Sequence, residues 1–151
     1  MPKVQAVWIH GSGVRPEREG YFITKRHYKD GAVFKTHGSE WFQFALPTPV
    51  ILDNQRSSMV KCFVLYETAS GARITDIQLY NGRQKIKSFG GLSLSGKHST
   101  SVDSSNSWTI NPPIEMIFGV AICVNVDFGN AQTGSVPNIR FAAAGADFLT
   151  A

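Results

Sequence analysis

Apolar and polar residues alternate with a period of two along most of this chain of 151 residues. Successive side chains of an extended strand point to opposite faces, so this period predicts strands with one buried and one exposed face. The strongest hairpin signal is Asn81-Gly82, between the alternating segments 74–80 and 83–89. Asp30-Gly31 gives a second hairpin signal, between segments 21–28 and 32–35. No segment has a convincing helical period.

The longest apolar run, residues 114–128, reads as one extended segment with Met116, Phe118 and other large residues on one face. The opposite face carries small residues, including Ala121 and Cys123. This composition suits a strand at the centre of a sheet, with another group packed closely over it.

Short strands, about nine to eleven of them with turns every 8–12 residues or so, predict an all-β fold, an antiparallel β-sandwich or jelly roll. The length is that of a single domain, residues 1–151. A short strand over residues 108–110 is expected before Asn111-Pro112-Pro113. A closed β-barrel remains an alternative, because alternation does not distinguish two packed sheets from one closed sheet.

Composition excludes several classes of protein. Hydrophobic residues make up 42% and charged residues 17%, which is typical of a globular domain. No apolar run reaches the roughly 18–20 residues that cross a bilayer, and the N-terminus lacks the apolar segment of a secretory signal. We therefore expect a cytoplasmic protein without membrane insertion.

The net charge of +4 is unevenly distributed, because residues 101–151 hold one basic residue and four acidic ones. Basic and aromatic residues do share faces of segment 21–28, as in sheets that bind nucleic acid. The basic residues elsewhere alternate with apolar ones, which is typical of solvated strand faces. This pattern, with the acidic final third, argues against nucleic acid as a partner.

Motifs for catalysis are missing from the sequence. The four histidines have no metal-ligand spacing, and the chain contains no G-x-S-x-G, P-loop or G-x-G-x-x-G motif. Cys62 and Cys123 lie mid-strand among apolar neighbours, where thiols are usually buried and inert. A disulfide between them is conceivable, but cytosolic redox conditions argue against it. We predict no catalytic residue, metal site or cofactor; a small β-barrel enzyme is the less favoured alternative.

Ligand binding has better candidates. Trp8 and His10 share one face of a strand before a Gly-rich turn, and His98 precedes a polar loop that contains Asp103 and Asn106. A sugar site needs an aromatic face and short polar groups, and loops can supply both. We predict that these five residues bind a ligand, with a glycan as the favoured class, in a lectin-like, non-catalytic module. Structural roles remain open: strand tryptophans are often core residues, and Ser, Asp and Asn favour turns.

Self-assembly is the second class of function. Natural sheet edges are protected by proline, lysine or bulges. Residues of this kind that could protect edges here are Pro47, Pro49, Lys85, Lys87, Pro112 and Pro113. They favour a monomer or a defined homo-oligomer over open-ended strand addition, so the alternative function is that of a structural or self-assembling protein.

Several motifs resemble one uncharacterised family of small bacterial all-β proteins, known as a domain of unknown function. They are Trp8-Ile9-His10-Gly11, the block 41–50 (WFQFALPTPV), Leu92 to His98, Gly119 to Phe128, and the ending Phe141 to Leu149 with its AGADF motif. The resemblance covers nearly the whole chain in order. It implies a free-standing bacterial β-domain and brings no activity and no catalytic residues.

Overall fold

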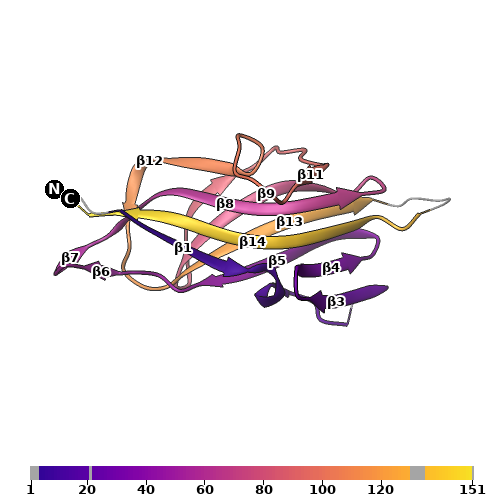
Figure 1. The fold of residues 1–151 in the computed structure, drawn as a ribbon, viewed down its shortest axis with the longest axis horizontal. Coiled ribbons are helices and arrows are strands. Elements are labelled where there is room, and N and C mark those ends of the chain that lie inside the picture. The colour runs from indigo at the N-terminus through magenta and orange to yellow at the C-terminus, as the bar shows by residue number, and fades with distance from the viewer. Residues whose placement is uncertain (1–3, 21, 130–134, 151) are drawn as a thin grey trace.

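The computed structural model describes residues 4–20, 22–129 and 135–150, which form two packed antiparallel β-sheets (Figure 1). Within these residues the only helix is a 3-10 turn, Gly11–Gly13, and none is long and apolar enough to cross a membrane. The strands are β1 (Val4–His10), β2 (Arg15–Pro16), β3 (Thr24–Tyr28), β4 (Gly31–Lys35), β5 (Gly38–Leu46), β6 (Ile51–Leu52), β7 (Gln55–Arg56), β8 (Ser58–Ala69), β9 (Arg73–Asn81), β10 (Gln84–Phe89), β11 (Lys97–His98), β12 (Ser107–Glu115), β13 (Val120–Gly129) and β14 (Asn138–Leu149).

The seven-stranded sheet, here called the front sheet, is built around the two longest strands, β8 and β14. On its far side from β8, β14 pairs with β4 along its first part and with β1 along its second part, and β3 pairs with β4. On its far side from β14, β8 pairs with β12 and β11. The five-stranded back sheet has the order β10-β9-β13-β5-β2. Strands β6 and β7 form a separate ribbon. The predicted antiparallel β-sandwich is confirmed, and β13 is the predicted central strand.

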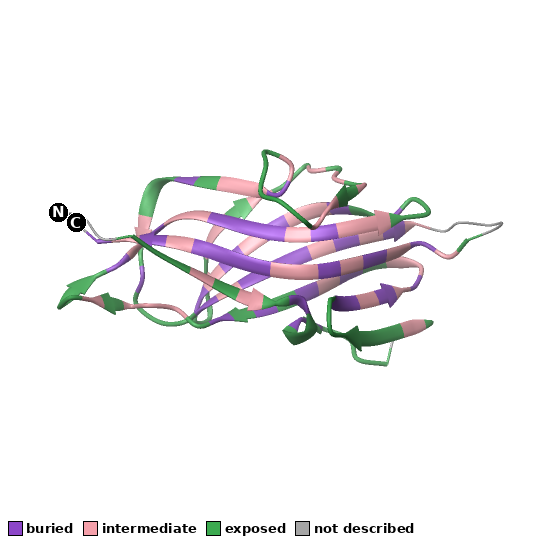
Figure 2. Ribbon diagram, in the orientation of Figure 1, coloured by how far each residue is buried: buried purple, intermediate pink, exposed green. Residues whose placement is uncertain are grey.

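The core between the sheets is dominated by phenylalanine. Phe42 of β5 lies 4.7 Å from Phe34 of β4 and 5.1 Å from Phe141 of β14, ring centre to ring centre. Phe44 meets Phe141 edge-on at 5.4 Å. Figure 2 shows the buried positions as regular bands along both sheets, as the alternating sequence predicts. Each fully buried ring contributes about 1.5–3 kcal/mol, so this cluster joins the two sheets firmly.

Two glycines allow β14 to change partner. β14 pairs with β4 up to Phe141 and with β1 from Ala143 onward, and a register irregularity lies between them. Gly11 and Gly31 both abut this junction: a Cβ on either would lie 1.9 Å or 2.3 Å, respectively, from the Phe141 carbonyl oxygen. Only residues without a side chain fit so close to backbone.

The prediction of one extended segment over residues 114–128 is wrong. β12 ends at Glu115 and β13 begins at Val120, and Phe118 between them is 62% exposed. The backbone turns here because Asn81 accepts the Phe118 N–H at 2.8 Å and Gly82 donates to the Gly119 carbonyl at 3.0 Å. These long-range bonds outweigh local alternation.

β12 also departs from the prediction, because it continues through Pro112 and Pro113 to Glu115. Between Thr109 and Ile114 the register against β8 is irregular, so the prolines lie where no ladder hydrogen bond is needed.

In segment 21–28, Tyr21 lies outside the described residues, and Phe22 packs in the core, 5.2 Å from the Phe34 ring.

Candidate functional site

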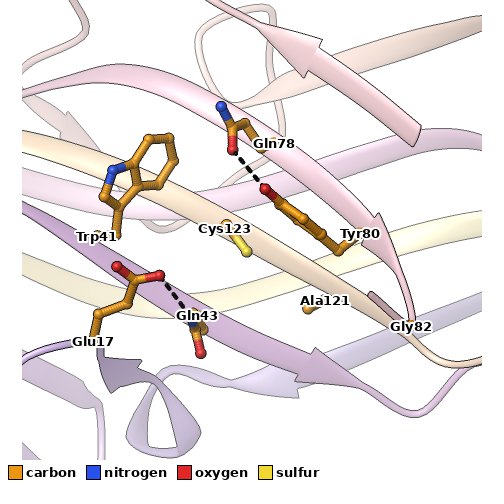
Figure 3. Close-up of a pocket in the computed structure, with 8 residues that line it drawn as sticks. All are labelled: Glu17, Trp41, Gln43, Gln78, Tyr80, Gly82, Ala121 and Cys123. Atoms are coloured by element: carbon orange, nitrogen blue, oxygen red, sulfur yellow. Dashed lines mark hydrogen bonds between the residues drawn. The ribbon is translucent and has the colours of Figure 1, made fainter. Parts of the chain in front are cut away.

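A trough of about 460 Å³ lies on the outer face of the back sheet (Figure 3). Its floor consists of Ala121 and Cys123 from β13. Long side chains rise on either side, Trp41 and Gln43 from β5 and Gln78 and Tyr80 from β9, with Glu17 and Gly82 at the margins. Small residues on the central strand therefore create the space, while its neighbours form the walls.

The strand register explains this arrangement. Cys123 is directly opposite Gln43 on β5 and Gln78 on β9. Ala121 is likewise opposite Tyr80. Residues in register on neighbouring strands of one face are in side-chain contact range, so a short residue between two long ones leaves a depression.

Polar groups in the trough are held in place by one another. Glu17 accepts a hydrogen bond from the Gln43 side-chain amide at 2.9 Å, and its backbone N–H donates to the Trp41 carbonyl at 3.0 Å. The Tyr80 hydroxyl donates to the Gln78 side-chain oxygen at 3.5 Å. The lining residues that the structure describes include no lysine, arginine or histidine, and they offer uncharged hydrogen-bond donors and acceptors together with the Glu17 carboxylate.

The two aromatic residues are far apart along the trough. Trp41 is in register with Asn125, four positions along β13 from Ala121, the partner of Tyr80. Two strand spacings of ~4.8 Å and four residues at ~3.4 Å put the Trp41 and Tyr80 Cα atoms roughly 16 Å apart. A ligand that contacts both rings must be extended.

The thiol in the floor is poorly suited to nucleophilic catalysis. Burial raises the pKa of Cys123 to about 11 and that of Cys62 to about 12. A nucleophilic cysteine needs a lowered pKa, so both thiols stay protonated at neutral pH. Both are free, Cys62 in the front sheet and Cys123 in the back sheet. Among the described residues no group of three His, Cys, Asp or Glu side chains is placed to hold a metal ion.

Trp8 lies on the outer face of the front sheet, where it is 40% exposed. Its indole reaches across Gly145 and stacks on Phe63, with ring centres 5.0 Å apart and planes inclined by 20°. A Cβ at Gly145 would lie 2.5 Å from Trp8 Cδ2, so the glycine is what lets the indole lie there. His10, on the same face, accepts the Ser12 N–H on Nδ1 at 3.0 Å and caps the 3-10 turn.

The polar loop at residues 99–106 is organised by Asn106, which is fully buried. Its side-chain oxygen accepts the Asp103 N–H at 2.9 Å, and its amide donates to the carbonyls of Ser101 (2.7 Å) and His98 (3.1 Å). Asp103 accepts the N–H of Ser105 at 2.7 Å. The hydrogen-bonding groups of Asn106 thus fold the loop.

These two groups of predicted site residues are not brought together. Trp8 is in register with Gly145, Gly145 with Phe63, and Phe63 with Ser107, the residue after the loop. Three strand spacings, roughly 14 Å, therefore separate Trp8 from Ser107. Ligand binding by the five residues stays a prediction, and it concerns two separate places. One holds Trp8 and His10, and the other holds His98, Asp103 and Asn106.

Sequence reasoning did not select Trp41 and Tyr80, although part of the signal was present. Alternation in Trp41-Phe42-Gln43-Phe44 places Trp41 and Gln43 opposite the core phenylalanines, hence on an outer face. The small residues Ala121 and Cys123 predicted a group packed closely over this strand, whereas the structure has an open trough there. The sequence does not show which strands lie beside β13 in the sheet. The wall residues on β5 and β9 could therefore not be assigned to the same site as the floor residues.

Comparisons with known proteins give distant similarities. No curated protein matches the sequence. Among solved structures, the CBM36-1 domain of a multidomain xylanase from the hindgut metagenome of Trinervitermes trinervoides is 10% identical, with TM-score 0.43 and coverage of 95% of this chain and 96% of that domain. A family 29 carbohydrate-binding module from Piromyces equi is 10% identical, with TM-score 0.40 and coverage of 99% and 91%. Similarities this distant say nothing of ligand or activity.

The family comparison is more specific. The model described as a family of unknown function (DUF6623) matches residues 1–148, which confirms the resemblance drawn from the motifs to an uncharacterised domain family. Because the match spans nearly the whole chain, the protein belongs to the DUF6623 family.

Proposed function

We propose that this protein is a non-catalytic binding module for a neutral oligosaccharide, which occupies the trough of the back sheet. The observation that carries the proposal is the placement of Trp41 and Tyr80 on opposite sides of a floor of small residues, with amide and carboxylate groups between them. The five residues predicted from sequence are not part of this trough.

The chemistry of the trough suits sugar rings. Aromatic faces can stack on the apolar side of a pyranose, and the half-buried Trp41 and Tyr80 rings line the trough. Glutamine amides both donate and accept hydrogen bonds, as vicinal hydroxyl groups require, and Gln43 and Gln78 flank the floor. A volume of about 460 Å³ lies within the usual range of ligand sites.

Charge and length narrow the ligand further. Glu17 is the only Asp or Glu among the lining residues, so an anionic sugar would be repelled and a neutral one tolerated. The separation of Trp41 and Tyr80 along the trough favours a chain over a monosaccharide.

The test begins with a glycan array of neutral oligosaccharides, followed by calorimetry of each hit. Trp41→Ala and Tyr80→Ala should each weaken binding about tenfold or more, as is usual for central aromatic contacts. Trp8→Ala is the matched control, since it removes an exposed aromatic from the other sheet, and it should bind as the unmodified protein does. The absence of any neutral hit contradicts the proposal; loss of binding in Trp8→Ala alone would instead support a site at Trp8 and His10.

A second pair of variants tests the floor without removing an aromatic. Ala121→Leu should fill the trough and abolish binding, whereas Ala6→Leu, at an exposed position on β1, should not. A bound ligand should also slow alkylation of Cys123 at pH 9; the fully buried Cys62 should stay unmodified in the folded protein. An unchanged rate of Cys123 alkylation at saturation would place the ligand elsewhere.

A defined homo-oligomer stays the alternative prediction, checked by light scattering.

A further inference from the structure

A second groove crosses the outer face of the front sheet. Two adjoining cavities, of about 460 and 150 Å³, share the lining residues Val33, Asn138 and Arg140. The larger extends over Arg26, Tyr28 and Lys35, and the smaller over Glu67 and Lys97. The trough described above belongs to the other sheet, so the two sites share no residue.

The groove follows one cross-strand row. Arg26 of β3 is in register with Val33 of β4, which is in register with Arg140 of β14. Arg140 is in register with Glu67 of β8, and Glu67 with Lys97 of β11. The short Val33 between two arginines leaves the depression, and the row extends over five strands, roughly 19 Å.

The groove has an excess of positive charge. Arg26, Lys35 and Lys97 form no salt bridge within the described part of the chain. Arg140 Nη1 binds Asp30 at 2.8 Å, and its Nε lies 3.9 Å from Glu67. Four basic side chains therefore face two carboxylates.

Arg140 is also fixed in position. Its guanidinium lies over the Tyr28 ring, 5.5 Å from the ring centre, while Asp30 holds its end. A positioned cation loses less conformational freedom when it binds an anion.

We propose that this groove binds an anionic polysaccharide through its carboxylate or sulfate groups. Arg26 and Lys35 offer unpaired cations at one end and Lys97 at the other, which matches a chain with repeated negative charges. Thr24 and Asn138, which also line the groove, supply neutral hydrogen-bonding groups for sugar hydroxyls.

Nucleic acid fits these observations less well. Single-stranded nucleic acid is held by bases stacked on free aromatic faces. Among the described residues that line the groove, Tyr28 is the only aromatic one, and the Arg140 guanidinium covers one face of its ring. Phe34, on the neighbouring strand, points into the core.

The experiment measures binding of the folded protein to polygalacturonate, which carries carboxylates, and to heparin, which carries sulfates. Hydroxyethylcellulose, a neutral chain, and a single-stranded DNA oligonucleotide are measured beside them. The variant Arg26→Gln/Lys35→Gln removes two charges from the groove. Its matched control, Arg83→Gln/Lys85→Gln, removes the same residue types from exposed positions at the β9–β10 hairpin of the back sheet.

We expect at least one anionic polysaccharide to bind the unmodified protein. Its affinity for the groove variant should be about 5- to 30-fold lower, and its affinity for the control variant should be unchanged. Raising the salt concentration should weaken the same interaction. Equal losses in both variants would show attraction to net charge only and overturn the proposal. So would oligonucleotide binding as tight as that of the polysaccharides, or no binding to either anionic chain. Loss of neutral-oligosaccharide binding in Trp41→Ala reports on the trough alone, so the two proposals fail separately.

Discussion

Replacing Gly145 with alanine tests the position of Trp8 on the front sheet. An added Cβ would lie 2.5 Å from Trp8 Cδ2, 2.7 Å from Cε3 and 2.8 Å from the Val7 carbonyl oxygen. Ordinary van der Waals contact begins at 3.4 Å, so the indole must withdraw by 0.9 Å, the difference between 3.4 and 2.5 Å. That displacement separates the indole from Phe63, on which it stacks.

The expected loss of stability follows from these contacts. Forcing a group into a filled space costs about 1–3 kcal/mol, and the lost aromatic pair about 0.5–1.5 kcal/mol, part of which is the same strain. We therefore expect Gly145→Ala to lower the free energy of unfolding by about 2–3 kcal/mol. For a domain of this size, each kcal/mol lowers Tm by about 2–4 °C.

A double-mutant cycle isolates the cause. Urea unfolding is measured for the unmodified protein, Gly145→Ala, Trp8→Ala and the double variant. Without the indole the two shortest contacts of the added Cβ are gone and the contact with the Val7 carbonyl stays, so the glycine substitution should cost at least about 1 kcal/mol less. Gly119→Ala is the control, because a Cβ there meets nothing within 4 Å. An equal cost of Gly145→Ala in both backgrounds would refute the placement of Trp8 over Gly145.

Three further variants test the fold and the buried thiols. Gly11→Ala should destabilise the protein by about 3 kcal/mol or more in urea unfolding, because its Cβ would lie 1.9 Å from a backbone oxygen that cannot move aside. Asn106→Ala removes three hydrogen bonds inside the loop, and at about 1 kcal/mol each Tm should fall by about 6–12 °C in calorimetry; an unchanged Tm would contradict this role. The raised pKa values of Cys62 and Cys123 mean that the folded state keeps thiol protons that the unfolded state releases above pH 9. Stability should therefore decline from pH 9 towards 11, and Cys123→Ala should make that decline shallower by up to about 1.4 kcal/mol per pH unit; identical slopes would be the contrary result.

Local patterns predicted most of the fold. Alternation predicted the strands, Asn81-Gly82 predicted the turn between β9 and β10, and the small face of residues 117–127 predicted that β13 is central. The errors occurred where long-range bonds decide the backbone. Phe118 is in a turn because the Asn81 side chain accepts its N–H, although the two residues are 37 positions apart in sequence.

The candidate site was harder to predict, because a residue type does not reveal what its polar atoms bind. Asn106 has the composition of a binding-loop residue, yet its side chain holds the loop together. Trp8 is exposed because Gly145, on a strand distant in sequence, lets the indole lie across it. The Trp8 position depends on a long-range strand pairing, whereas the Asn106 bonds are local but depend on a loop conformation that residue types alone do not specify.

The two grooves share one construction with opposite electrostatics. In each, a short residue on an inner strand, Cys123 or Val33, is flanked in register by longer side chains on both neighbours. The residues that directly flank the short one then differ in chemistry: they are amides in the back sheet and arginines in the front sheet. The grooves lie on the outer faces of the two sheets, which pack about 10 Å apart with the apolar core between them. A neutral chain in the trough would bring no charge to the other face and would not touch an anionic chain in the front-sheet groove, so we expect the two proposed ligands to bind independently.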